Sequence, residues 1–181
     1  MKRPEEAFQQ LSHLFHEVGL IVNHKPWRWL TCWFGGSAGI ILSYRMDRFF
    51  YLLIGDAWIL IRLFFLPCFL MLRLISAPHE IHYRSKIGRG LKILHGSLGV
   101  VVSGNAVIGR HLTLTGGNCI GEKDRGELHI GDNVTLGANA VILGPVHIGN
   151  NVEIGAGAVV IHDAVDHSVL VGVPAHPLSS V

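Results

Sequence analysis

The chain has 181 residues, of which 49% are hydrophobic and 15% are charged, and its formal net charge is +2. This length indicates one domain, or one domain with a helical appendage, and the apolar content excludes intrinsic disorder. Three cysteines are too few for a disulfide framework or a zinc cluster. Residues 126–181 contain no lysine or arginine, so the chain lacks the broad basic face of a nucleic-acid-binding protein.

The first ten residues read MKRPEEAFQQ. Acidic residues follow the basic pair directly and no apolar stretch comes after them, so this segment is not a secretory signal. We therefore expect a cytoplasmic protein with reduced cysteines.

Residues 1–80 are rich in aromatic residues and predict helices. Pro4, Glu5 and Glu6 suit the first turn of a helix that ends before Gly19. Its expected apolar face consists of Phe8, Leu11, Leu14, Phe15 and Val18. Residues 27–39 are expected to form an irregular aromatic connection.

From Ser37 to Ile75 the chain is strongly apolar, with scattered charges. Within residues 1–80 the longest uncharged run, Trp29–Tyr44, has 16 residues, which is shorter than the roughly 20 that a membrane-spanning helix needs. We expect helices that pack on one another and on a partner subunit. The alternative is peripheral contact with the inner face of the cytoplasmic membrane.

From Ile81 onward the sequence has a period of six. Neither a helix nor an ordinary strand repeats every six residues, whereas a three-sided solenoid does, with one short strand and one turn per hexapeptide. The aliphatic residue of each hexapeptide points inward, and the glycine that often follows it allows the tight corner. The thirteen aliphatic positions are Ile81, Ile87, Ile93, Val102, Ile108, Leu114, Ile120, Ile130, Leu136, Ile142, Ile148, Ile154 and Val160.

Two interruptions break this period. Nine residues separate Ile93 from Val102, and ten separate Ile120 from Ile130. The second interruption predicts that residues 122–129 bulge out of the solenoid as a loop.

These repeats resemble those of the hexapeptide-repeat acyltransferases, in particular the serine acetyltransferase branch. The similar segments are IHYRSKIGRGLKILHG (81–96), IGDNVTLGANAVILG (130–144), IGNNVEIGAGAVV (148–160) and GVPA (172–175). The resemblance implies a mainly β fold: a left-handed parallel β-helix over 81–170, a helical region over 1–80 and a C-terminal tail over 171–181. The short helical half followed by LHG is most similar to acetyltransferases of bacterial polysaccharide synthesis, of the colanic-acid type.

His95 follows an inward aliphatic residue by two positions, beside the first interruption. Transfer of an acetyl group to a hydroxyl needs a base that takes the hydroxyl proton and returns it to the leaving thiol, and histidine suits both tasks. The resemblance implies that His95 is this base and that Glu80, fifteen residues upstream, orients its imidazole. The alternatives are that His95 is a solvated turn residue and that Glu80 only caps the first coil.

The resemblance also implies that acetyl-CoA is the acyl donor and that its pantetheine arm lies along small residues at coil corners. Each of these residues is also what the repeat itself requires. Lys123 and Arg125 of the predicted loop could contact the CoA phosphates, or the loop could simply be solvated. The small residues at matching positions are Gly121, Gly137, Ala138, Gly155 and Ala156.

Two departures from the branch argue against serine as the acceptor. Relatives have an aspartate before the base that holds the substrate ammonium, and Leu94 stands there. Relatives also have a histidine after the loop arginine, where this chain has Gly126. Because an apolar neighbour suits a neutral hydroxyl, we expect a sugar or a precursor of a cell-surface polysaccharide as the acceptor. Serine O-acetylation and a non-catalytic scaffold are the alternatives.

Twelve histidines invite the question of a metal site. The γ-class carbonic anhydrases share the solenoid and bind zinc between subunits through three histidines, two of them five apart, and only His162 and His167 have that spacing here. These lie at the end of the repeats, so we expect no metal. His129 and His147 occupy equivalent corners 18 residues apart and are expected to stack on one face, where His129 could line the acceptor groove.

The resemblance finally implies a homotrimer with active sites between subunits.

Overall fold

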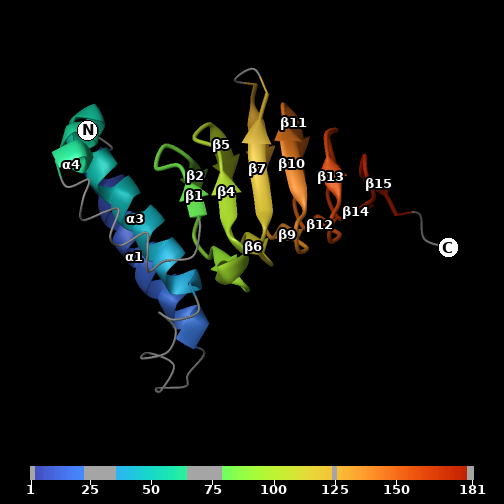
Figure 1. Ribbon diagram of the computed structural model, residues 1–181, viewed down its shortest axis with the longest axis horizontal. Coiled ribbons are helices and arrows are strands. Elements are labelled where there is room, and N and C mark those ends of the chain that lie inside the picture. Colours follow the sequence, from blue (N-terminus) through green and yellow to red (C-terminus); the bar gives the residue numbers. More distant parts are fainter. Residues whose placement is uncertain (1–2, 23–35, 65–78, 124–125, 179–181) are drawn as a thin grey trace.

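The computed structural model describes residues 3–22, 36–64, 79–123 and 126–178. They form a parallel β-solenoid of about four turns behind an N-terminal helical region, consistent with the expected left-handed β-helix (Figure 1). The helices are α1 (Arg3–Val22), α3 (Ser37–Ile54) and α4 (Trp58–Phe64), with short 3-10 turns η1 (Gly55–Ala57) and η2 (Gly96–Leu98).

The strands form three sheets, one for each side of the solenoid. Sheet A contains β1 (His79–Ile81), β4 (Val100–Val102), β7 (Asn118–Glu122), β10 (Val141–Gly144) and β13 (Val159–Val160). Sheet B contains β2 (Lys86–Ile87), β5 (Ala106–Ile108), β8 (Leu128–Ile130) and β11 (Val146–Ile148). Sheet C contains β3 (Lys92–Ile93), β6 (Thr113–Leu114), β9 (Thr135–Leu136), β12 (Glu153–Ile154), β14 (Val169–Val171) and β15 (His176–Pro177).

The hexapeptide aliphatic residues form the core in three stacks, one per sheet. In sheet A, for example, Ile81 pairs with Val102, which pairs with Ile120, and the stack continues to Val160. All thirteen predicted positions are buried, none more than 7% exposed. The period of six therefore identified the inward face correctly, because one residue per strand must fill the narrow interior.

The two interruptions have different structures. The first contains η2 and returns the chain to β4. The second is shorter than the predicted 122–129 loop, because Glu122 still belongs to β7 and Leu128 already begins β8. Strand pairing of both ends with the neighbouring coil β10–β11 explains the difference.

The corners between sheets B and C require left-handed backbone. Gly90, His111, Asn133, Asn151 and His167 occupy equivalent corners in successive coils, each with a φ between 54° and 91°. The backbone bonds repeat as well, since the N–H of each of the last four donates to a carbonyl one coil earlier. Asparagine and glycine are the residues that adopt this conformation most readily, which explains their recurrence in the repeat.

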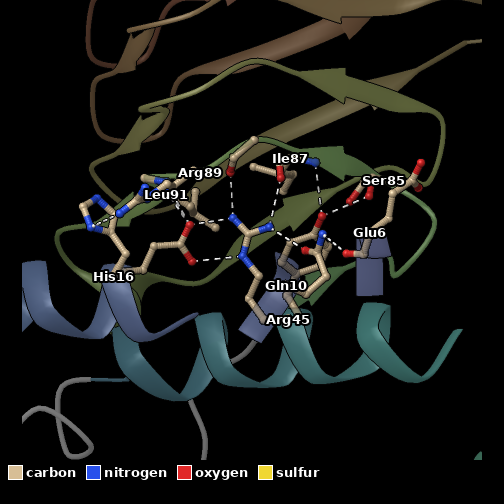
Figure 2. Close-up of polar contacts among 12 residues, drawn as sticks. Glu6, Gln10, His16, Arg45, Ser85, Ile87, Arg89 and Leu91 are labelled. Atoms are coloured by element: carbon tan, nitrogen blue, oxygen red, sulfur yellow. Dashed lines mark hydrogen bonds and ion pairs between the residues drawn. The ribbon is translucent and has the colours of Figure 1, made fainter. Parts of the chain in front are cut away.

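The helices cover the N-terminal end of the solenoid, where the first coil has no preceding coil to pair with (Figure 1). Figure 2 shows how the buried side chain of Arg45 on α3 reaches this open end. It donates to the carbonyls of Ile87 (2.9 Å) and Gly88 (2.7 Å), while Glu17 of α1 accepts the N–H groups of Gly90 and Leu91, each at 3.0 Å. The helical region thus satisfies backbone groups that would otherwise form an open sheet edge.

The helical predictions were partly wrong. Helix α1 does not end before Gly19 but continues to Val22, and Phe8 and Phe15 of its predicted apolar face are 62% and 72% exposed. The buried face instead carries Ala7, Leu14, Val18 and Val22 together with the polar Gln10 and Glu17. The face of α1 that is buried therefore includes polar residues because it packs on the end of the solenoid, where backbone groups need hydrogen-bond partners. Residues 27–35 of the predicted irregular connection (27–39) lie outside the described residues, and its last three residues, 37–39, belong to α3 instead.

Strand β1 begins at His79, two residues before the predicted start of the solenoid. At the other end β14 reaches Val171, and β15 pairs with it antiparallel, so the predicted tail contributes a strand to sheet C. None of the described helices is long and apolar enough to span a bilayer.

Candidate functional site

His95 lies in the turn between β3 and β4, directly before η2, and its side chain is exposed. Its backbone N–H donates to the carbonyl of Thr115 (2.8 Å), and its own carbonyl accepts the N–H of Leu98 (3.1 Å). Gly116 of the next coil packs on the same carbonyl, since a Cβ there would lie 2.5 Å from the His95 oxygen. The imidazole of His95 is therefore exposed, while the backbone of the same residue is fixed by hydrogen bonds of both its N–H and its carbonyl.

The turn belongs to the edge of the solenoid between sheets C and A, which we call the C–A edge. The backbone bonds place His95, Gly116, Ala138 and Ala156 at this edge in successive coils. The N–H of Asn139 donates to Gly116 O (2.9 Å), and that of Gly157 donates to Ala138 O (2.8 Å). The predicted base and four of the predicted donor-binding residues, Gly137, Ala138, Gly155 and Ala156, thus share one edge although up to 61 residues separate them (95 and 156).

The other predicted donor-binding residues lie at the far end of the sheet A strands, which we call the A–B edge. Gly121 is in β7 and Lys123 follows that strand with an exposed side chain. Arg125 lies outside the described residues. Gly126 packs against Pro145, where a Cβ would lie 2.6 Å from the proline Cβ. Within one chain the predicted donor-binding residues therefore form two groups at opposite ends of sheet A.

Glu80 is on the outer face of β1, aligned with Val101 of β4, and its side chain is exposed. Together with His79 and His82 it lines a cavity of about 570 Å³ between sheet A and helices α3 and α4. Burial lowers the pKa of the His82 imidazole, and the nearby Arg84 lowers it further. Within the single described chain no hydrogen bond or ion pair joins Glu80 to His95, so the orienting role of Glu80 stays a prediction.

His129 and His147 are aligned on β8 and β11, and their ring centroids are 5.8 Å apart. The prediction that these two residues stack on one face of the solenoid is confirmed, with their rings tilted by 31° to each other. Nε2 of His129 lies 3.6 Å from Oε2 of Glu127, and the backbone N–H of His147 donates to Oδ1 of Asp163 (2.7 Å). Across the four described segments, no group of three histidine, cysteine or acidic side chains is arranged to hold a metal ion.

Two leucines flank His95 on the surface. Leu94 is 45% exposed and Leu98 is 54% exposed. Sequence reasoning singled out Leu94 but missed Leu98, whose only signal is its place inside the first interruption. Two exposed apolar residues therefore lie within three positions of the base along the chain.

Known proteins share both the repeat and the fold. Residues 128–162 match the family described as bacterial transferase hexapeptide (six repeats). Serine acetyltransferases of Staphylococcus aureus and Staphylococcus xylosus are each 44% identical to this chain over 101 residues, which is 54% of this chain. Those residues cover 47% of the Staphylococcus aureus protein and 46% of the Staphylococcus xylosus protein, so the chain spans about half the length of the curated relatives it matches.

The solved structures agree. The crystal structure of Neisseria gonorrhoeae serine acetyltransferase superposes with a TM-score of 0.75 and 28% identity, covering 97% of this chain and 68% of that one. A serine acetyltransferase in complex with CoA gives a TM-score of 0.61 and 25% identity, covering 77% of this chain and 55% of that chain. The chain is thus similar to serine acetyltransferases in its hexapeptide repeats and in its fold. The expected placement in the polysaccharide branch is not supported by these comparisons.

Proposed function

We propose that this protein is an acetyl-CoA-dependent O-acetyltransferase in which His95 is the general base. The observation that best supports the proposal is the placement of exposed His95 on the same edge as Gly137, Ala138, Gly155 and Ala156. A base and a strip of accessible backbone along one edge match what thioester transfer to a hydroxyl requires.

In this mechanism the imidazole of His95 removes the proton from the acceptor hydroxyl as its oxygen attacks the thioester carbonyl. A tetrahedral intermediate forms, and backbone N–H groups of a neighbouring coil stabilise its oxyanion. The intermediate collapses by breaking the carbon–sulfur bond, and the imidazolium returns the proton to the departing CoA thiolate. Ester and free thiol are the products.

The small residues of the C–A edge fit a pantetheine arm. Gly137, Ala138 and Gly155 are half-buried and Ala156 is exposed, so all four are at least partly accessible and none carries a side chain larger than a methyl group. Lys123 at the A–B edge supplies a cation for phosphate. Because the two groups of residues lie at opposite ends of sheet A, a second subunit would bring an A–B edge beside a C–A edge, which supports a homotrimer with sites between subunits.

L-Serine is the acceptor favoured by the comparisons, since the curated relatives are serine acetyltransferases. One of the similar structures, at 29% identity, is a serine acetyltransferase in complex with serine. The corresponding role of this chain would be in cysteine biosynthesis.

A saccharide hydroxyl is the second candidate, and Leu94 favours it. An exposed leucine beside the base cannot pair with the ammonium of serine. Gly126 cannot be replaced by the histidine of relatives without moving Pro145, because even a Cβ would lie 2.6 Å from that ring. Both features remove contacts for a charged amino acid and leave a surface suited to a neutral acceptor.

The test is release of free thiol from acetyl-CoA by the full chain, with L-serine and a panel of bacterial sugars as acceptors. His95→Ala should lower kcat at least a hundredfold with every acceptor that the parent uses. His162→Ala is the matched control, because His162 is exposed and distant in sequence from the turn. Binding of CoA, measured by isothermal titration, should persist in His95→Ala.

The outcomes separate the candidates. Turnover with serine at ordinary enzymatic rates supports a serine acetyltransferase, and turnover only with a saccharide supports the second candidate. A parent chain that neither binds CoA nor releases thiol contradicts enzymatic activity and favours a scaffold. A His95→Ala variant within tenfold of the parent contradicts the role of His95.

A further inference from the structure

Helix α3 is fixed to the first coil at several points. The hydroxyl of Tyr44 donates to the carbonyl of Ser85 (3.0 Å) and accepts the N–H of Ile87 (3.2 Å). Arg48 donates to the carbonyls of Tyr83 (3.1 Å) and Ser85 (2.6 Å). Together with the buried bonds of Arg45, these contacts leave the helix little freedom to slide along the end of the solenoid.

The N-terminus of this anchored helix contacts the turn that carries His95. The hydroxyl of Ser37, in the first turn of α3, accepts the backbone N–H of Gly96 at 3.2 Å. Both residues are buried, and Ser37 is only 7% exposed. No other hydrogen bond of the Gly96 N–H is present among the described residues, so this buried donor depends on the Ser37 hydroxyl.

The packing at this contact is as close as backbone allows. A Cβ on Gly96 would lie 2.6 Å from the Ser37 nitrogen and 2.9 Å from the Gly36 carbonyl carbon. Gly36 itself has a φ of 76°, which brings the chain into the helix beside η2. The residue directly after the proposed base is thus held between the start of α3 and the solenoid.

We infer that Ser37 is a positioning residue for acetyl transfer: its hydroxyl holds the Gly96 amide and thereby sets the backbone from which the His95 imidazole extends. The inference rests on the proposed function of His95. It gives the helical region a role in the reaction beyond covering the first coil. A base displaced by about an ångström can lose up to a hundredfold in rate, whereas donor binding at Ala138 and Ala156 depends on other coils.

The experiment compares steady-state kinetics of acetyl transfer by the parent, Ser37→Ala, Ser37→Thr and Ser168→Ala. Ser37→Ala should lower kcat about tenfold, with the KM for acetyl-CoA within twofold of the parent. Ser37→Thr keeps a hydroxyl at the same position and should recover most of the lost kcat. Ser168→Ala removes another side-chain-to-backbone bond, to Val165 O, far along the chain and should leave kcat unchanged. Thermal unfolding of each variant reports folding separately.

A Ser37→Ala variant with kcat within twofold of the parent would overturn the inference. So would a loss of kcat that accompanies a large fall in Tm and is not recovered by Ser37→Thr, because the role would then be structural. A parent without thiol release overturns the proposed function itself. A parent whose turnover disappears in His95→Ala but survives in Ser37→Ala overturns only the role of Ser37.

Discussion

Arg45 of α3 and Glu17 of α1 form an ion pair in which neither side chain has any exposed surface. Nε of Arg45 donates to Oε2 of Glu17 at 3.0 Å, and a third side chain, Gln10, accepts from Nη1 at 2.9 Å. The two charges also complete the bonding of the first coil: Arg45 donates to the carbonyl of Ile87 (Figure 2), and Glu17 accepts the N–H of Gly90. The pair therefore joins two helices and the solenoid through one network of hydrogen bonds.

Removing one partner of this pair should strongly destabilise the fold. Arg45→Met leaves the Glu17 carboxylate buried and two coil carbonyls without donors, at an expected cost of about 3–5 kcal/mol in the free energy of unfolding. Urea denaturation of the parent and the variant measures it. Arg84→Ala, which breaks the exposed pair with Asp56, is the control and should have a much smaller effect. An equal fall in the free energy of unfolding for the two variants would contradict the prediction, because the buried ion pair would then stabilise the fold no more than the exposed one.

The stability should decrease in mild acid because of His13. Burial, together with the nearby Arg45 and Arg89 charges, lowers the pKa of His13 below its ordinary 6.5. The unfolded chain then binds a proton at a higher pH than the folded chain does, so the free energy of unfolding falls as the pH drops through about 6.5 toward the folded pKa. In His13→Leu this part of the fall should disappear. Urea midpoints at pH 8 and pH 5.5 measure it, and identical pH dependence in both proteins would contradict the prediction.

Substitution by alanine should affect stability differently at two of the predicted donor-binding glycines. A Cβ at Gly137 would lie 2.5 Å from the backbone nitrogen of Ala156, whereas a Cβ at Gly121 would meet nothing closer than a Leu143 methyl at 3.8 Å. Gly137→Ala should therefore cost about 1–3 kcal/mol of stability, and Gly121→Ala should cost almost none. Thermal unfolding compares them. An equal fall in Tm for both variants would contradict the packing argument.

The acceptor preference should change in Leu94→Asp. A carboxylate beside His95 can pair with an ammonium group, so the ratio of kcat/KM for L-serine to that for a neutral saccharide should rise at least tenfold. Steady-state kinetics with both acceptors measures the ratio. Leu98→Asp adds the same charge to the same turn and is the control; an equal rise there would mean that any nearby negative charge has the effect.

The hexapeptide pattern alone predicts the solenoid. The aliphatic residue of each hexapeptide points inward, as Ile108 and Ile148 do. Parallel pairing aligns it with an inward residue of the neighbouring coil, so the local pattern is enough to predict the fold. The two interruptions also marked where the chain would leave the repeat, and one of them contains His95.

The way in which the helical region meets the solenoid follows from tertiary packing and from no pattern in the sequence. Arg45 and Arg48 are two of the scattered charges in an apolar stretch of the sequence, and they are buried because the open end of the first coil presents backbone carbonyls that need donors. The contact between Ser37 and Gly96 joins residues 59 apart in sequence. No sequence period relates these two positions, so their contact depends on how the helices pack against the solenoid.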